Sequence, residues 1–158
     1  MRDSSYNFGK FLEDFVVGET ISHWPGKTIF ESDNNLFSLL TMNHHPIHID
    51  ENYAAGQQHG KILVVGTLVF SVIVGMTVRD ISGKAIANLD YESVKHLSPV
   101  HVGDTLYAET EILEAHPSSS KKDRGIVHVE TRARNQNHKG VLLFRRHLLV
   151  PRRHRLGQ

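Results

Sequence analysis

The sequence predicts an α+β fold in which a curved antiparallel sheet wraps around one long apolar helix. Two observations support this prediction. Segment 62–78 contains only three polar side chains, so a helix formed from it is apolar on every side and needs to be enclosed. Residues 85–153 instead show the pattern of long strands separated by turns. A single layer of sheet around one buried helix accommodates both patterns.

Short elements are expected before this helix. Residues 17–32 form two extended pieces around a turn at Pro25-Gly26. From Asp33 the apolar side chains follow helical spacing, and Ser32 or Asp33 can cap the start of that helix. A second short helix is expected in residues 51–58.

Segment 62–78, ILVVGTLVFSVIVGMTV, is open to more than one interpretation. Its 17 residues reach only the lower limit for a helix that spans a membrane. Two glycines and three hydroxyl side chains weaken that alternative, and the abundance of Val and Ile favours a strand locally. Because the segment is too long for an ordinary strand, we interpret it as a helix held within the sheet. We expect no membrane association.

The second half of the chain predicts the sheet itself. Within it, Val127, Val129 and other apolar or small residues alternate with charged ones, as in a sheet with one face in water. Such a sheet leaves an open face and edge that can pair with another chain, so we expect a homodimer or higher homo-oligomer. The expected strands are 85–97, 104–116, 125–136 and 140–153.

Composition narrows the functional classes. The 18 basic and 17 acidic residues nearly balance, which gives no indication of nucleic-acid binding. The absence of cysteine excludes disulfides and thiolate zinc sites. Residues 1–15 lack the apolar core of a signal peptide, so a cytoplasmic location is expected. We expect one domain over residues 1–158, with its core at 11–153 and a flexible tail at 154–158.

The segment LTMNHHPIHID, residues 40–50, contains three histidines between two expected helices. Pro46 restricts His45 to an extended conformation and stiffens the turn, which places His48 in a preset loop near the start of the apolar helix. His44, His45 and His48 could bind a metal ion. However, adjacent imidazoles before a proline rarely converge, and no carboxylate or thiolate accompanies them, so we expect no metal site. His48 alone could also be an ordinary turn histidine.

Residues 42–54, MNHHPIHIDENYA, match a loop of the form Gly-Asp-x-Asn-Pro-(Ile/Leu)-His-x-Asp-x-x-Tyr-Ala. Further motifs follow in the same order at 11–20 (FLEDFVVGET) and 93–106 (SVKHLSPVHVGDTL), and in the last two strands. In these motifs the chain resembles the MaoC-like (R)-specific enoyl-CoA hydratase/dehydratase family over roughly residues 11–153. The resemblance implies a single hot-dog domain, in agreement with the helix-in-sheet prediction. The loop residues that match are Pro46, Ile47, His48, Asp50, Tyr53 and Ala54.

The resemblance also implies a reaction, in which water adds to a trans-2-enoyl-CoA or leaves a 3-hydroxyacyl-CoA. No cofactor is implied, because coenzyme A is part of the substrate. The chemistry needs a base for water, an acid for the α-carbon, and donors for the thioester oxygen. By resemblance, His48 is the acid/base. The backbone around Val65, Gly66 and Thr67 forms the oxyanion site, and a glycine there allows close approach of a ligand.

The chain departs from the family at three of these positions. The family's loop Asp corresponds to Asn43, its Asn to His45, and the His that often precedes the helix-start Gly to Val65. An Asn amide can orient water but cannot accept its proton. Asn43 is therefore a candidate for orienting water, and His48 has to transfer protons alone or use another group.

The sequence Met-Asn-x-His-Pro also resembles a mesaconyl-CoA hydratase-like branch of the family. Loss of the Asp charge, together with His44 and His45, makes the pocket less negative and favours a dicarboxylic mono-CoA ester as substrate. Asn43 could instead cap a helix end, and Asp50 could cap the next helix. Besides His45, Val65 and Thr67, the candidates for contact with substrate or the CoA phosphates are Lys95 (next to His96), Lys121, Lys122 and Arg124, although charged turns are also commonly just solvated.

Two other functional classes remain open. A hot-dog thioesterase shares the fold but needs a carboxylate near the helix, which Glu31 or Asp33 could supply. A non-catalytic acyl-CoA-binding protein would retain the binding site without the activity, and Asn43 in place of the family's Asp would then reflect the loss of catalysis.

Overall fold

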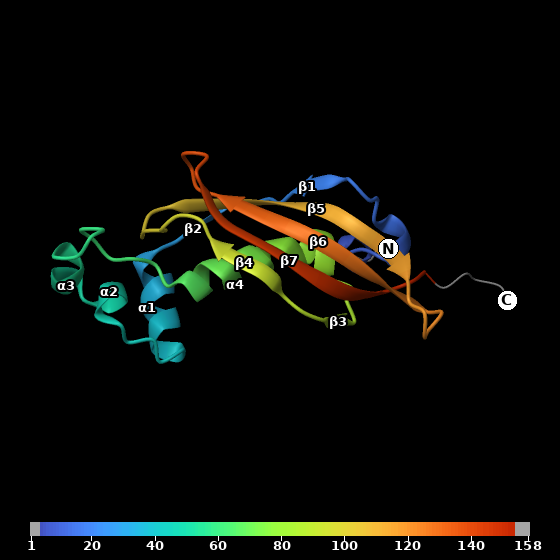
Figure 1. Cartoon of the computed structure of the whole chain (residues 1–158), viewed down its shortest axis with the longest axis horizontal. Helices are drawn as coiled ribbons and strands as arrows, with labels where there is room; N and C mark the ends of the chain where they lie inside the picture. Colours follow the sequence, from blue (N-terminus) through green and yellow to red (C-terminus); the bar gives the residue numbers. More distant parts are fainter. Residues whose placement is uncertain (1–3, 154–158) are drawn as a thin grey trace.

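Three long strands form the centre of an antiparallel sheet (Figure 1). They are β5 (Thr105–Pro117), β6 (Arg124–Arg134) and β7 (Gly140–Pro151), joined by two hairpins. Their registers run from Tyr107↔Arg134 to Pro117↔Gly125 and from Arg124↔Pro151 to Arg134↔Gly140. The computed structural model describes residues 4–153, so the tail expected at 154–158 lies outside the described residues.

Short strands complete both edges of the sheet. Strands β1 (Thr20–Ser22) and β2 (Lys27–Thr28) pair with β5, while β3 (Ala87–Asn88) and β4 (Glu92–His96) pair with β7. The single strand predicted at 85–97 is therefore wrong. Between β3 and β4 the Asp90 carboxylate, rather than the backbone, accepts the His147 backbone N–H at 2.9 Å, which interrupts the ladder.

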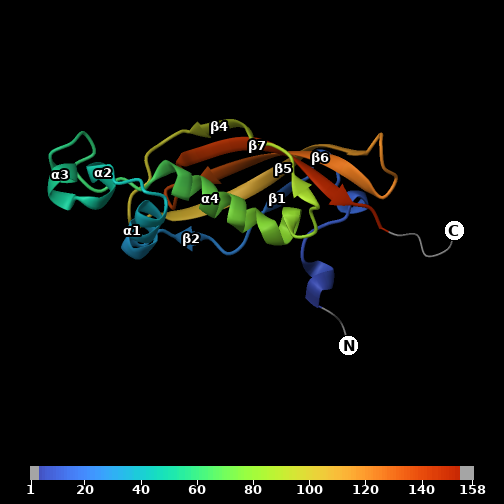
Figure 2. The ribbon, with the colours of Figure 1, turned by 90° about the horizontal axis from the view of Figure 1, so that it is seen from below.

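Helix α4 (Gly66–Thr77) crosses the inner face of the sheet and continues into a π-helical turn, η3 (Val78–Ser82). Its apolar side chains pack against those of β5, β6 and β7 in one core. The sheet covers one side of the helix, as Figure 2 shows. On the other side, the polar or small residues Thr67, Ser71 and Gly75 recur at a spacing of four and are exposed. Within one chain, the predicted enclosure therefore holds only for the sheet side.

The predicted helix starts four residues earlier than the observed one. Residues 62–65 are extended, because Leu63 forms a bridge with His101 and the Val64 N–H donates to the Val100 carbonyl at 2.9 Å. No helix within residues 4–153 is long and apolar enough to cross a membrane.

Three helices gather at the end of the sheet where α4 begins (Figures 1 and 2). They are α1 (Glu31–Leu40), α2 (Pro46–Ile49) and α3 (Glu51–Ala55). Phe30 is the N-cap of α1, and Asp33 contributes by accepting the Phe30 N–H at 2.9 Å, so the predicted cap at Ser32 or Asp33 is wrong. Two short 3-10 turns, η1 (Ser4–Asn7) and η2 (Leu12–Asp14), lie before β1.

The predicted alternation along β6 is confirmed with one exception. Val127, Val129 and Thr131 are buried toward the core, whereas Arg132 is exposed. Glu130 belongs to the outer face, yet only 7% of its side chain is exposed, because Arg132 and Arg145 pair with it at 2.5 and 2.7 Å. Burial alone would raise the pKa of Glu130, but the hydrogen bonds from these two arginines lower it below its ordinary value.

Candidate active site

His48 lies on α2, a single helical turn, rather than in the loop predicted for it. Pro46 occupies the first position of the turn, and His45 before it is extended (φ −61°, ψ 125°), as predicted. The His48 Nδ1 atom lies 2.6 Å from the Leu63 carbonyl oxygen. Because a carbonyl only accepts, Nδ1 carries the proton and Nε2 keeps a free lone pair. This is the tautomer that a general base requires.

Asn34 on α1 joins His48 to the start of α4. Its side chain is buried, its Nδ2 donates to the His48 carbonyl at 3.0 Å, and its Oδ1 accepts the Val65 N–H at 2.9 Å. Asn34 therefore fixes the distance between the imidazole of His48 and the N-terminus of the helix. No sequence pattern singles out this residue. The structure shows that Asn34 and Ser38, not leucines, occupy the buried face of α1.

The predicted oxyanion residues lie at the N-terminus of α4, with Val65 as the N-cap. The Val65 N–H is already bound by Asn34 and offers nothing to a substrate. Within residues 4–153, no hydrogen bond uses the N–H of Gly66 or Thr67. These two free donors, together with the positive end of the helix dipole, can stabilise an oxygen that gains negative charge.

A cavity of about 350 Å³ joins His48 to this helix start. Its wall includes His48, His59, Gly66, His96 and Ser98, and contains no acidic side chain. A Cβ atom at position 66 would lie 3.1 Å from Cε1 and 3.2 Å from Nε2 of His96, so a side chain there requires the His96 ring to shift by a few tenths of an ångström. The sequence analysis named His96 only as a neighbour of Lys95.

Asn43 and His45 line neither this cavity nor a second one of about 330 Å³ on the other side of His48. The C-cap of α1 is Thr41, so the cap considered for Asn43 is wrong; the Asn43 N–H donates to the Ser38 carbonyl at 3.0 Å just after the helix. His45 Nδ1 accepts the Ile47 N–H at 3.2 Å as the N-cap of α2. Asp50 Oδ1 accepts the Tyr53 N–H at 2.9 Å as the cap of α3. The imidazoles that face the cavity are those of His48, His59 and His96, not those of His44 and His45.

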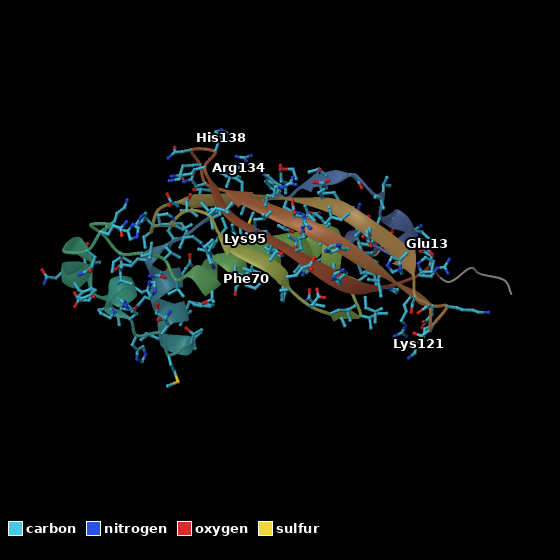
Figure 3. The ribbon with its side chains drawn as sticks, in the orientation of Figure 1. Glu13, Phe70, Lys95, Lys121, Arg134 and His138 are labelled. Atoms are coloured by element: carbon cyan, nitrogen blue, oxygen red, sulfur yellow. The ribbon has the colours of Figure 1, made fainter. Side chains whose placement is uncertain are left out.

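The predicted CoA-binding cations lie in two places. Lys95 precedes His96 on β4 but pairs in register with Leu143, so its side chain lies on the opposite face of the sheet from His96 and does not line the cavity. Lys121, Lys122 and Arg124 belong to the β5–β6 hairpin, at the opposite end of the sheet from α2 (Figures 1 and 3). Arg124 also pairs with Asp123 at 2.8 Å, and this contact holds the pKa of Asp123 at about 2. A single chain does not bring these three cations to His48.

The structure also shows where the two carboxylates considered for a thioesterase, Asp33 and Glu31, lie. Asp33 accepts hydrogen bonds from Lys27 Nζ at 2.6 Å and from the Phe30 N–H, so it is already paired. Glu31 lines the second cavity, which His48 and Asn34 share.

Residues 14–135 match the model of the MaoC like domain. The chain belongs to the MaoC-like domain family. The mesaconyl-CoA hydratase of Cereibacter sphaeroides is 34% identical to this chain over 147 residues, which cover 93% of this chain and 43% of the relative. The β-methylmalyl-CoA dehydratase of Chloroflexus aurantiacus is 33% identical over 93% of this chain and 42% of its own length. The chain thus spans less than half the length of each of these two relatives.

Solved structures confirm the hot-dog fold of this MaoC-like domain. A MaoC domain protein dehydratase from Chloroflexus aurantiacus superposes with a TM-score of 0.89 and 31% identity, over 96% of this chain and 43% of the other. A Mycobacterium tuberculosis protein with a double hot-dog fold gives a TM-score of 0.82 at 22% identity, over 95% of this chain and 46% of the other.

Proposed function

We propose that this MaoC-like domain is the catalytic unit of an acyl-CoA hydratase/dehydratase. The observation that supports this most strongly is that His48, with a free Nε2, and Gly66, with a free N–H, line the same cavity. In hydration, Nε2 accepts a proton from water while the oxygen bonds to C3 of a 2-enoyl-CoA. The electron pair of the double bond moves to the thioester oxygen, which accepts hydrogen bonds from the start of α4.

We further propose a dicarboxylic mono-CoA ester, such as mesaconyl-CoA, as the substrate. The cavity wall has three imidazoles and no carboxylate, so a second negative charge on the substrate meets no repelling group there. The names of the two relatives of similar sequence agree with this class. No cofactor is needed beyond the CoA of the substrate, and a cytoplasmic location remains a prediction.

We also propose that the working unit contains a second hot-dog domain, from another copy or from a longer chain. The support is the exposed edge β3–β4, the exposed stripe on α4, and a length below half that of the relatives. Such a partner could bring cations such as those of the β5–β6 hairpin to the CoA phosphates. The exposed apolar residues along the edge are Ile86, Leu89, Tyr91, Val94 and Leu97.

The test is turnover of mesaconyl-CoA and crotonyl-CoA by wild type, His48→Ala and a control, His44→Ala. His44 is exposed and lines neither cavity. Enoyl absorbance and free thiol are followed together. Loss of absorbance without thiol release, in wild type and His44→Ala only, supports a hydratase. Thiol release indicates a thioesterase, and binding of CoA esters without turnover indicates the non-catalytic class. Faster turnover of crotonyl-CoA than of every dicarboxylic ester would contradict the proposed substrate.

A further inference from the structure

The hydration reaction requires two proton transfers, and the residues considered so far account for one. His48 Nε2 can take a proton from water, but the α-carbon also has to receive one. Asn43 cannot donate a proton in this way, and it lies outside the cavity. No acidic side chain lines the cavity within the described part of the chain. The site therefore needs another proton donor.

We propose that His96 is this donor and protonates the α-carbon of the substrate. The inference rests on the proposed hydratase function. His96 ends β4 and pairs in register with Leu142, which is buried in the core, so its side chain points toward the helix side of the sheet. It lines the same cavity as His48, but approaches from a different strand.

The distances allow His96 to reach the α-carbon of a thioester bound at the start of α4. Its Cε1–Nε2 edge lies 3.1–3.2 Å from the position of a Cβ atom on Gly66. Standard covalent geometry then puts Nε2 within about 6 Å of the Gly66 nitrogen. A thioester oxygen that accepts this N–H lies about 3 Å from the nitrogen. The α-carbon is two bonds from that oxygen, so it falls within reach of the imidazole.

The ring of His96 is available for this role. Within residues 4–153 no hydrogen bond or ion pair engages its side chain, and it is exposed to the cavity. The other titratable groups in the cavity wall are His48 and His59, and the His59 ring lies 5.9 Å from that of His101.

The two histidines complete a balanced reaction. As the water oxygen bonds to C3, the water proton passes to His48 Nε2 and the C2–C3 π pair shifts to form an enolate at the thioester. The enolate pair then forms a C–H bond at C2 with a proton from the imidazolium form of His96. The step leaves His48 protonated and His96 neutral, and exchange with solvent restores both. Dehydration follows the same path in reverse, with His96 as the base.

The test compares His96→Gln and His96→Phe with wild type and with His116→Gln, an exposed histidine in β5 outside the cavity. The readouts are kcat and KM for mesaconyl-CoA, and exchange of the C2 hydrogen of the hydrated product in D2O. We expect both His96 variants to lose about 10²–10⁴ in kcat, with little change in KM. Exchange at C2 falls in parallel, and the control keeps the wild-type values.

Three outcomes would overturn the assignment. If His96→Phe stays within about fivefold of wild type while His48→Ala is inactive, His96 is only a packing residue and the hydratase function stands. If His96→Gln keeps the rate and His96→Phe does not, His96 is a hydrogen-bond donor and not an acid. If wild type turns over no enoyl-CoA, the proposed function fails, and the role of His96 fails with it.

Discussion

The two ends of the sheet differ in how their polar groups are hydrogen-bonded. Far from α2, the His23 side chain is fully buried, with Nδ1 donating to Asp80 at 2.8 Å and Nε2 bound to the Thr110 hydroxyl at 2.7 Å. At the other end, His48 uses one nitrogen and keeps the other free, and the N–H groups of Gly66 and Thr67 have no acceptor within residues 4–153. The polar groups around His23 are used up within the fold, whereas those at the start of α4 are free to bind a substrate.

The largest expected effect concerns Asn34, which connects His48 to the start of α4. Asn34→Ala leaves the Val65 N–H and the His48 carbonyl without their partner, at a cost of about 1–3 kcal/mol in the free energy of unfolding. We expect kcat to fall by about 10² or more, because the base loses its position relative to α4. Urea unfolding and steady-state kinetics measure both. Asn52→Ala, an exposed position on α3, is the control, and equal values for the two variants would contradict the role of Asn34.

At the end of the sheet that contains His23, we expect a substitution to lower stability without affecting catalysis. The buried Thr110 hydroxyl forms hydrogen bonds with Nε2 of His23 at 2.7 Å and with the Thr131 hydroxyl at 2.9 Å. Thr110→Val keeps the shape but leaves both partners unpaired, so we expect a loss of about 1–3 kcal/mol in the free energy of unfolding. The kcat value should not change, and Thr41→Val at the exposed end of α1 is the comparison. A selective fall in kcat would mean that this network serves the reaction.

Two glycines of α4 should respond differently to alanine. Gly66→Ala brings a methyl group to 3.1 Å from the His96 ring and should lower kcat by about tenfold or more. Gly75 has open space around it, so Gly75→Ala should raise the free energy of unfolding by up to about 1 kcal/mol without affecting kcat. Thermal unfolding and steady-state kinetics of the two variants measure these effects. If Gly66→Ala kept the wild-type kcat, the start of α4 would accommodate a methyl group.

The smallest expected effect is a pH-dependent one at the start of α1. The hydrogen bonds from Lys27 and from the Phe30 N–H lower the pKa of Asp33 below its unfolded value of about 3.9. The resulting stability is present above that unfolded value and is lost as the pH falls through the lower, folded pKa. Asp33→Asn should therefore cost about 0.5–1 kcal/mol at pH 7, and the difference from wild type should disappear in acid. Urea titrations at pH 7 and pH 3 measure it, and a difference independent of pH would exclude the charge as its cause.

The sequence could predict the fold and one half of the site, because both depend on local patterns. Alternation identifies the long strands, the apolar segment identifies α4, and Pro46 fixes the backbone before His48. The interruption between β3 and β4 was missed, because it depends on Asp90 contacting His147 from a distant strand.

The other half of the site depends on contacts between segments far apart in the chain. Asn34 reaches Val65 from another helix, and His96 reaches Gly66 from an edge strand. Neither residue has a spacing signal of its own. The leucines of α1 were also misleading, because Leu36 and Leu40 are 59% and 74% exposed while the polar Asn34 and Ser38 are buried.

The most direct test compares one histidine from each end, His48→Gln and His23→Gln, in the hydration of mesaconyl-CoA. We predict that His48→Gln lowers kcat by at least about 10² with little change in Tm. His23→Gln should lower Tm and leave the kcat of the folded enzyme unchanged. The reverse pattern, with an active His48→Gln and a folded but inactive His23→Gln, would contradict the assignment of the catalytic site to the start of α4.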